Sequence, residues 1–161
     1  MSHRSTTLLM NDSPEIDEVD STILRLLREN ARMSYLEMSR KTGISDATIQ
    51  HRLKRMRERG VIDRFTVLAN PAATGYTVTA IILVQTATEM HDEAKTALSA
   101  LPEVSEVYSV LGEYDLYIKV WAKSLEELNR FINDQIRAIS GIEDLMEIVV
   151  VERVKEDAPP I

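Results

Sequence analysis

The sequence contains no cysteine, and this absence excludes disulfide bonds and thiolate metal sites. No apolar run approaches the roughly 20 residues that a membrane-spanning helix needs. The segment from Met1 to Ser13 lacks the apolar core of a secretory signal peptide. Because a chain without cysteine suits a reducing compartment, we expect a cytoplasmic protein with no membrane partner.

Arrangements of residues typical of an enzyme site are also lacking. There is no Ser/His/Asp or Cys/His set, no Gly-rich phosphate loop, and no cluster of histidines and carboxylates with metal-ligand spacing. Aromatic residues are few, with two Phe and one Trp. We therefore expect no catalytic residues, no metal site and no cofactor.

The net charge of −7 is unevenly distributed along the chain. Residues 20–66 hold eleven Lys or Arg against six Asp or Glu, whereas residues 67–161 hold seven against sixteen. A protein that binds nucleic acid needs a basic surface only where it meets phosphate groups. The distribution favours a front part that binds nucleic acid, although an acidic rear part is equally typical of any soluble domain.

Residues 34–59 carry the pattern of two short helices joined by a tight turn. Ser34 followed by Glu37 forms a capping box, and Gly43 supplies the sharp exit that the turn needs. Ser45 can cap the second helix. The apolar residues of that helix fall on one stripe, namely Ile49, Leu53 and Met56.

The opposite face of the second helix is basic and rich in hydrogen-bonding groups. Its residues are Gln50, His51, Arg52, Lys54, Arg55 and Arg57. An amphipathic helix of this kind, held by a preceding helix, is the build of a helix-turn-helix recognition helix. The plainer alternative is a solvated face on an ordinary helical hairpin. The agreement of caps, glycine and apolar spacing favours DNA binding.

The segments on either side complete a DNA-binding domain. From Ile16 to Asn30 a helical stripe of apolar residues predicts a first helix that packs on the pair. From Val61 to Val67 the sequence alternates and is rich in β-forming residues, which predicts a strand or hairpin. A small sheet at this place would make the domain a winged variant.

The rear half alternates strand and helix patterns in the order β-α-β-β-α-β, which predicts a ferredoxin-like domain in an α+β protein. The expected strands are 76–87, 104–111, 114–122 and 145–154, and the expected helices are 91–101 and the segment from Ser124 to Gly141. Both faces of the first strand are largely apolar, so we expect both to be covered. The predicted plan is a disordered tail 1–15, a winged helix-turn-helix domain 16–66, a linker 67–75, a ferredoxin-like domain 76–154, and a tail 155–161.

Several ordered motifs resemble the Lrp/AsnC family, the feast/famine transcriptional regulators. They are Asp20 to Arg32 in the first helix, Ser45 to Ile62 at the recognition helix, Asn70-Pro71 with Gly75-Tyr76 at the interdomain joint, Gly112-Glu113-Tyr114-Asp115 in the rear domain, and Ser140-Gly141-Ile142 near its end. The resemblance covers about Ile16 to Val154. It departs at Leu111, where the family often has a polar residue, and at Glu147, where it commonly has Thr.

The resemblance implies a transcriptional regulator that binds double-stranded DNA. It also implies a homodimer joined through the rear domains, with dimers assembling into tetramers or octamers. Small effectors, usually amino acids, bind between rear domains of the family and change assembly or DNA affinity.

We assign candidate DNA-binding residues along the second helix of the pair. Ser45 and Thr48 are expected near phosphates, because a helix N-terminus favours anions. Arg52 and Arg55 are expected to neutralise phosphates, and Tyr35 and Arg40 are further backbone candidates. The residues best placed for base edges are Asp46, Ala47, Gln50 and His51. Pure capping for Asp46, and a phosphate or solvent position for His51, remain equally open.

The candidate effector residues surround the turn at Gly112. They are Tyr108, Ser109, Gly112, Glu113, Tyr114 and Asp115. A carboxylate beside a glycine turn can hold an ammonium group, while free backbone N–H groups can hold a carboxylate. Because Glu113 and Glu147 would add negative charge, a ligand with extra positive charge is favoured. The alternative is that Gly112 only permits the turn and Asp115 only pairs locally.

Two other classes of function remain as alternatives. The sirohaem decarboxylases resemble the same two-domain plan, but they would need His and Arg side chains around a tetrapyrrole, and the rear half has only His91 and few Arg. RNA-recognition modules share the rear fold order but need paired aromatic residues on central strands. Tyr114 and Tyr117 do not form that pattern.

Overall fold

The computed structural model describes residues 16–156. Its chain divides into two compact units, with the boundary between Val67 and Leu68. The predicted tail 1–15 and residues 157–161 of the second tail lie outside the described residues. Within the described part, no helix combines the length and the apolar character needed to cross a membrane.

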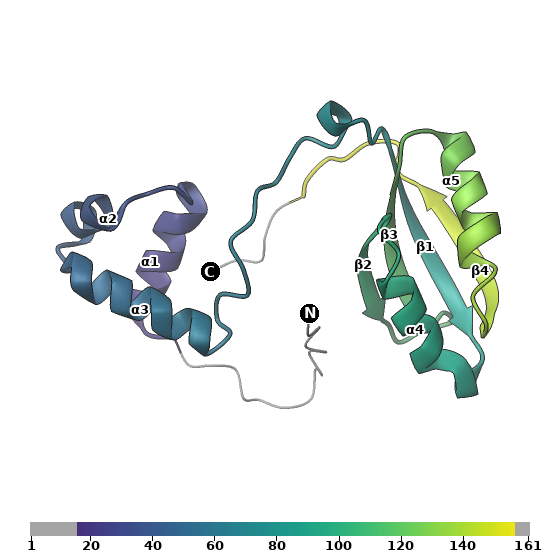
Figure 1. Ribbon diagram of the computed structural model, residues 1–161, viewed down its shortest axis with the longest axis horizontal. Helices are drawn as coiled ribbons and strands as arrows, with labels where there is room; N and C mark the ends of the chain where they lie inside the picture. Colours follow the sequence, from purple (N-terminus) through teal and green to yellow (C-terminus); the bar gives the residue numbers. More distant parts are fainter. Residues whose placement is uncertain (1–15, 157–161) are drawn as a thin grey trace. The chain divides into compact units, whose positions relative to one another are not determined.

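The first unit contains three helices, α1 (Glu18–Glu29), α2 (Tyr35–Thr42) and α3 (Asp46–Glu58), drawn from purple to blue in Figure 1. The predicted caps are confirmed, since Ser34 accepts a hydrogen bond from the Glu37 N–H and Ser45 accepts one from the Thr48 N–H. Gly43 ends α2 with φ of 74°, in the left-handed region that a side chain would strain. The helix-turn-helix predicted at residues 34–59 is therefore formed.

The core of the first unit is small and lies between the three helices. Its buried residues are Ile23, Met33, Met38, Ile49, Leu53 and Met56. The predicted stripe of α3 supplies half of this set, which confirms the direction in which the helix faces. Each fully buried side chain of this size contributes about 1.5–3 kcal/mol to folding.

The strand or hairpin predicted for Val61 to Val67 is not formed. Residues 16–67 contain helices and connecting segments but no strand. A β-rich segment becomes a strand only beside a neighbour that pairs with its backbone groups, and residues 16–67 offer none. Phe65 and Val67 accordingly remain 56% and 86% exposed.

The second unit contains a four-stranded antiparallel sheet in the order β2-β3-β1-β4. Its strands are β1 (Val78–Thr86), β2 (Val104–Ser109), β3 (Leu116–Ala122) and β4 (Ile142–Val149). Its helices are α4 (His91–Ser99) and α5 (Leu125–Phe131), the latter continued by the π-helical segment η3 (Ile132–Ile136), with short 3₁₀ turns at η1 (Ala72–Thr74) and η2 (Thr88–Met90). This order and pairing confirm the predicted ferredoxin-like arrangement.

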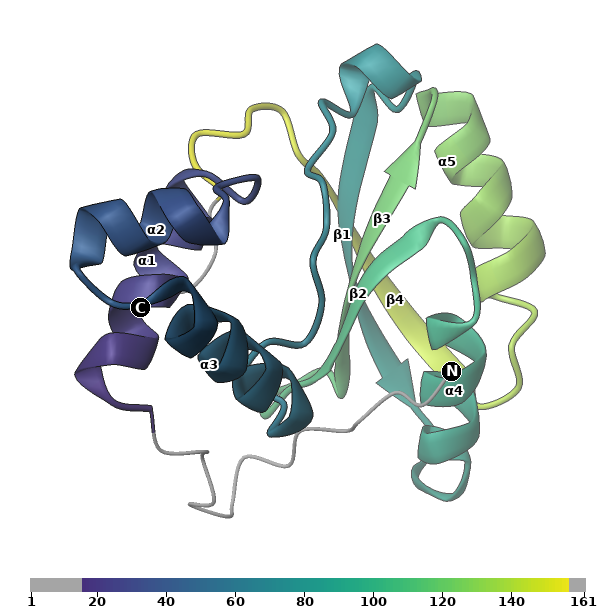
Figure 2. The same ribbon diagram turned by 60° about the vertical axis from the view of Figure 1, so that its left-hand side comes forward.

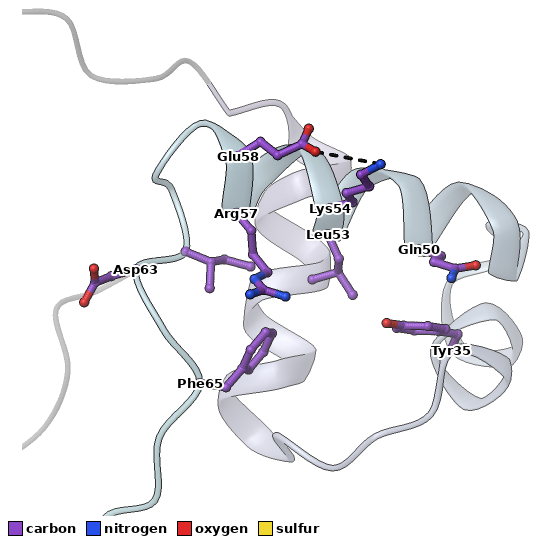
Figure 3. A pocket seen from close by; sticks show the side chains of 9 residues that line it. Tyr35, Gln50, Leu53, Lys54, Arg57, Glu58, Asp63 and Phe65 are labelled. Atoms are coloured by element: carbon purple, nitrogen blue, oxygen red, sulfur yellow. Dashed lines mark ion pairs between the residues drawn. The ribbon is translucent and has the colours of Figure 1, made fainter. Parts of the chain in front are cut away.

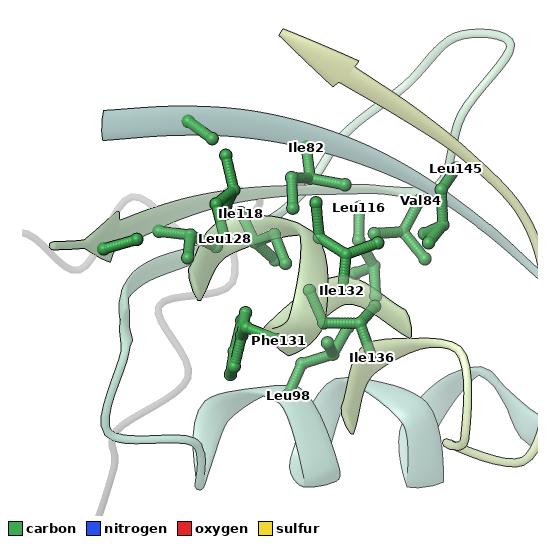
Figure 4. Packing of buried hydrophobic residues seen from close by; sticks show 13 residues of the cluster. Ile82, Val84, Leu98, Leu116, Ile118, Leu128, Phe131, Ile132, Ile136 and Leu145 are labelled. Carbon is green, nitrogen blue, oxygen red and sulfur yellow. The ribbon is translucent and has the colours of Figure 1, made fainter. Parts of the chain in front are cut away.

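Both long helices of this unit cover the same face of its sheet (Figures 1 and 2). Alternate residues of β3, beginning at Leu116 and ending at Ala122, point into this layer and are buried. Figure 4 shows Leu98 of α4 and Phe131 and Ile136 of the α5 region packed against the strands. The main hydrophobic core therefore lies between the sheet and its helices.

The other face of the sheet has no helix of this unit against it. Leu83 of β1 lies between Tyr117 of β3 and Met146 of β4 on this face. Met146 and its neighbour Ile148 are 44% and 43% exposed. The expectation that both faces of β1 are covered is thus met on one face only within a single chain.

Two strands end earlier than predicted. β2 stops at Ser109 rather than Leu111, and β4 stops at Val149 rather than Val154. The register explains the second difference, because Val149 already pairs with Ala80 near the start of β1. The Val150 N–H donates to the Thr79 carbonyl, and β1 begins only one residue before Thr79, so residues after Val150 have little of β1 left to pair with.

Candidate DNA-recognition helix and effector turn

The first turn of α3 is closed by its own side chains. Ser45 Oγ accepts a hydrogen bond from the Thr48 N–H at 3.1 Å and lies 2.8 Å from Thr48 Oγ1. Asp46 Oδ1 accepts a hydrogen bond from the Ala47 N–H at 2.8 Å. A carboxylate therefore already occupies the position where the helix dipole would attract an anion. Ser45 and Thr48 are both exposed, and the phosphate contact expected there stays a prediction.

The residues predicted to reach base edges lie on open surface. Asp46, Ala47, Gln50 and His51 are all exposed. Lys54 and Arg57 are also exposed, and they follow Gln50 at intervals of four and three residues, which places them on one side of the helix. The sequence assigns Lys54 and Arg57 no separate role, since six residues share the basic face of this helix. Only packing shows which of the six make no contact with α1.

A pocket of about 550 Å³ lies on this side of α3 (Figure 3). Among its lining residues are Gln50, Lys54 and Arg57, with Tyr35 of α2 and Phe65 of the following segment. Tyr35 and Phe65 are 43% and 56% exposed. The pocket gathers two cations, an amide and two aromatic rings, which are groups that contact nucleic acid. The carboxylates of Glu58 and Asp63 also line it, and Lys54 Nζ lies 3.8 Å from Glu58 Oε1.

Arg52 and Arg55 face α1 instead of this open surface. Arg52 Nη1 donates a hydrogen bond to Asp17 Oδ2 and lies 3.3 Å from Asp20 Oδ1. Arg55 Nη2 lies 3.1 Å from Asp20 Oδ2. The sequence could not reveal these pairs, because Asp20 and Arg55 are 35 residues apart along the chain. Both guanidinium groups, expected to neutralise phosphates, instead neutralise carboxylates of the same chain.

The contacts of this cluster shift two ionisation equilibria. The pKa of Asp17 is lowered, first by the hydrogen bond from the Asp20 N–H and then by the hydrogen bond from Arg52. The pKa of Arg52 is raised, chiefly by its hydrogen bond to Asp17. Both shifts favour the charged pair.

The turn between β2 and β3 is held firmly at its base. The Val110 N–H donates to the Asp115 carbonyl at 2.9 Å, which closes the turn, and the Asp115 N–H donates to the Val84 carbonyl at 3.0 Å. The Asp115 carboxylate accepts two further bonds through Oδ2, from the Thr86 N–H at 2.7 Å and from Thr86 Oγ1 at 3.1 Å. Local pairing, the alternative left open for Asp115, is therefore present.

The tip of the turn projects from the sheet. Leu111, Gly112 and Glu113 are exposed, and Leu111 is completely so. Gly112 does not have a positive φ, and a Cβ atom built on it would meet nothing within 4 Å. No contact within residues 16–156 therefore requires glycine at this position.

Tyrosines flank the turn on both sides. The ring of Tyr108, 54% exposed, lies 5.7 Å from the ring of Tyr117, measured between centroids. The carboxylate of Glu106 is the main cause that raises the pKa of Tyr108, and burial followed by the charge of Asp144 raises the pKa of Tyr114. Both phenols remain neutral hydrogen-bonding groups. Ser109, the remaining candidate, is exposed and pairs with Leu116.

Glu147 does not add negative charge at the turn. It pairs with Ile82 on the side of the sheet that the helices cover, and its Oε1 accepts a hydrogen bond from Arg137 Nη2 at 2.9 Å. Its charge is thus balanced by a neighbouring cation. The preference for a ligand with extra positive charge loses this support.

Turn residues line neither the pocket beside α3 nor the second described pocket, which lies around Phe131 and Arg130. The His/Asp/Glu clusters of the described part also include none that could hold a metal ion.

An exposed recognition helix in one unit and an antiparallel α+β unit with an exposed turn define a DNA-binding regulator with an attached second domain. Residues 16–63 match the family model of winged helix-turn-helix DNA-binding domains, and residues 79–160 match the Lrp/AsnC ligand binding domain. The chain belongs to the Lrp/AsnC family of transcriptional regulators.

Relatives of known name agree with this assignment. The chain is 37% identical over 141 residues to the HTH-type transcriptional regulator FL11 of Pyrococcus furiosus, covering 88% of this chain and 93% of that one. Among solved structures it is similar to AsnC of E. coli, with a TM-score of 0.85, 29% identity, and coverage of 90% and 98%. It also shares the fold of a transcriptional regulator from Neisseria meningitidis solved as an L-Met complex, with a TM-score of 0.82, 23% identity, and coverage of 88% and 94%.

Proposed function

We propose that this regulator reads specific DNA sequences with α3 and that a small amino-acid-like effector changes its assembly or its DNA affinity. The exposed side chains at the start of α3 carry the first part of this proposal. Gln50 can bond an adenine edge in bidentate fashion, and the Ala47 methyl can contact a thymine methyl. Lys54, Arg57 and Tyr35 border this surface and supply the backbone contacts that fix its register.

Asp46 and His51 are also proposed to contact base edges, since both are exposed at the same end of α3. Ser45 and Thr48 serve as the cap, and Arg52 and Arg55 as partners of α1. A regulator of this kind acts where DNA is, and we propose a cytoplasmic location.

The assembly proposed here is a dimer that buries the open sheet face. Apolar side chains of Leu83, Met146 and Ile148 form a patch on that face. Two such sheets packed face to face would bury this surface as a sandwich core does. A dimer also explains how a single small recognition module gains affinity, because it engages two half-sites about one helical turn, or a multiple of it, apart. Tetramers or octamers would follow from contacts between dimers.

The effector is proposed to bind at the turn from Tyr108 to Asp115, between second units of different subunits. The turn is held by hydrogen bonds at its base and is exposed at its tip. Gly112 leaves its main chain accessible from outside. The Neisseria meningitidis neighbour, held with L-Met, supports an amino acid as the class of ligand for this fold.

DNA-binding assays on two proteins test the first part. The full chain should shift duplex DNA in a gel, and a fragment of residues 66–161 should not. Binding by the fragment alone would move the DNA surface out of α3. The effector is tested by calorimetric titration of the twenty amino acids into the wild type and Gly112→Val. Heat from at least one amino acid in the wild type, lost in the variant, is expected; equal binding by both places the site elsewhere.

An enzyme of the sirohaem-decarboxylase type is not favoured. His91, the single histidine of the second unit, is half-buried, and its Nδ1 lies 2.9 Å from Thr86 Oγ1. A side chain tied in this way is poorly placed to act on a tetrapyrrole. The aromatic pair of the open face lies on β3 and the edge strand β2, whereas β1 presents aliphatic residues, and this also disfavours RNA binding.

A further inference from the structure

Two carboxylates, Asp17 at the N-cap of α1 and Asp20 within it, form one ion-pair cluster with two guanidinium groups of α3. Asp20 bridges both arginines, with 3.3 Å to Arg52 and 3.1 Å to Arg55, and Asp17 makes a second contact with Arg52. The cluster joins the recognition helix to the helix behind it. Two of the positive charges counted on α3 are therefore balanced within the unit.

The four side chains of this cluster differ in exposure. The Asp20 side chain is 1% exposed, whereas Asp17 is 49% exposed. Arg52 and Arg55 lie between these limits, at 23% and 39%. A buried carboxylate is stable only when it is paired, so Asp20 holds its partners more firmly than a surface ion pair would. Asp17 lies nearer the solvent and can be changed with little damage to packing.

One hydrogen-bond donor of Arg55 is unsatisfied within residues 16–156. Its Nε is buried and has no hydrogen-bond partner among the described residues. Internal pairing thus does not satisfy the guanidinium group completely. The side chain keeps some of the donors that could bond a phosphate if the carboxylate released it.

We propose that Asp17 and Asp20 determine DNA specificity by withholding Arg52 and Arg55 from DNA phosphates. A phosphate contact adds affinity for every sequence alike, whereas a base contact discriminates. By neutralising two arginines internally, the carboxylates lower the affinity for non-specific DNA. The exposed base-reading side chains of α3 then contribute a larger fraction of the binding free energy. The inference rests on the proposed role of α3 in DNA recognition.

The expected size of the effect follows from counterion release. The slope of log K against log salt is negative, and each phosphate contact makes it steeper by about 0.9. This corresponds to about an eightfold gain in affinity at 0.1 M salt relative to 1 M. If Arg52 and Arg55 are withheld, Arg52→Ala and Arg55→Ala should leave the wild-type slope nearly unchanged. Releasing Arg52 should make it steeper by up to about 0.9.

The test uses the full chain and a 30-base-pair duplex of mixed sequence, with binding measured by fluorescence anisotropy across a series of KCl concentrations. Asp17→Asn removes the charge but keeps a residue that caps helices well. It should bind the duplex several-fold more tightly than the wild type, with a steeper salt slope. Asp17→Asn combined with Arg52→Ala should return to the wild-type slope. Asp20→Asn should have the larger effect if it folds.

A matched control removes the same charge from the neighbouring position. Glu18→Gln changes an exposed carboxylate in the first turn of α1 and should leave the salt slope at the wild-type value. An equal increase in Glu18→Gln and Asp17→Asn would reduce the effect to overall charge and overturn the inference. A loss of about 0.9 in slope for Arg52→Ala or Arg55→Ala alone would also overturn it, by placing these arginines on phosphate already. No binding of the duplex by the wild type would instead refute the proposed function.

Discussion

The carboxylate of Asp115 and the backbone of Thr86 are joined by a 2.7 Å hydrogen bond from the Thr86 N–H to Asp115 Oδ2. The Thr86 hydroxyl reaches the same oxygen at 3.1 Å and also lies 2.9 Å from His91 Nδ1. Thr86 ends β1, His91 begins α4 and Asp115 precedes β3. One buried threonine therefore ties the base of the exposed turn to the strand and helix beside it.

Asp115→Ala should destabilise the second unit. The substitution leaves the buried Thr86 N–H and hydroxyl without this acceptor, and a buried unsatisfied group costs about 1–3 kcal/mol. The fluorescence of Trp121, the single tryptophan, reports unfolding of this unit in urea. Glu113→Ala, which removes an exposed carboxylate from the same turn, is the matched control and should change the free energy of unfolding little. Equal losses in both variants would show that the bond to Thr86 contributes nothing.

Three Gly→Ala substitutions should distinguish glycines that the backbone conformation or the packing requires from Gly112, which neither requires. Gly141 has φ of 87°, and a Cβ there would lie 2.2 Å from Met90 Cβ, so Gly141→Ala should destabilise severely. Gly75 has φ of 89° but open space, so Gly75→Ala should lose about 1–2 kcal/mol from backbone strain alone. Gly112 has neither constraint.

Gly112→Ala should therefore leave the stability of the folded chain unchanged or raise it by about 0.4–1 kcal/mol, through reduced entropy of the unfolded chain. Thermal unfolding of the three variants measures this order. If Gly112→Ala proves as damaging as Gly75→Ala, the turn has a conformational requirement of its own, and accessibility to a ligand no longer explains the glycine.

The sequence predicted most of the fold, because caps and periodicity are local properties. Ser34, Gly43 and Ser45 mark helix ends wherever the helices pack, and the alternation of β3 appears directly as a buried side. The strand predicted at residues 61–67 failed for the opposite reason. A strand depends on a partner segment that can lie anywhere along the chain, and the local pattern does not reveal whether one is present.

Leu83→Arg should convert the proposed dimer into a monomer. Leu83 lies between Tyr117 and Met146 on the open sheet face, so a charge there would be buried in a face-to-face assembly. Sedimentation velocity at micromolar concentration measures the change. Leu125→Arg, at a residue of α5 that is 60% exposed on the helix-covered side, is the control and should keep the wild-type mass. A wild type that sediments as a monomer would contradict the dimer itself.

Gln50→Ala and Lys54→Ala should affect DNA binding differently. Loss of a base contact at Gln50 should change sequence preference by about 1–3 kcal/mol at one base pair. Loss of a phosphate contact at Lys54 should weaken binding to all sequences alike and lower the salt slope by about 0.9. Selection from a random duplex library, followed by salt titrations on the selected site, measures both quantities. A uniform loss for Gln50→Ala would remove it from base recognition.

The candidate site was less predictable than the fold, since a side chain acquires its role from neighbours distant in sequence. Arg52 and Lys54 look alike in sequence, yet the first pairs with α1 and the second lines an open pocket. The same holds for Glu147, whose charge is balanced by Arg137. Residue type and spacing select a candidate helix and a candidate turn, but only packing shows which of their side chains are already paired within the chain.

The stability gap between the wild type and Asp17→Asn should depend on pH. The pKa of Asp17 is lowered from its usual value of 3.8 in the folded chain, chiefly by the hydrogen bond from the Asp20 N–H and next by that from Arg52. At pH values around these two pKa values, the unfolded chain therefore binds more protons at Asp17 than the folded chain does. Stability consequently rises with pH until Asp17 is ionised in both states.

This contribution is complete above the unfolded pKa and is lost as the pH falls through the lowered pKa of the folded state. Asparagine keeps the cap but has no ionisation, so its stability lacks this dependence. Asp92, whose pKa is also lowered, chiefly by its hydrogen bond to Lys95, is present in both proteins and cancels in the difference. Thermal unfolding followed by circular dichroism at 222 nm should give the wild type a higher Tm than Asp17→Asn at pH 7. The difference in Tm should shrink below pH 3.8. A gap of the same size at both ends would mean that Asp17 stabilises α1 without its charge.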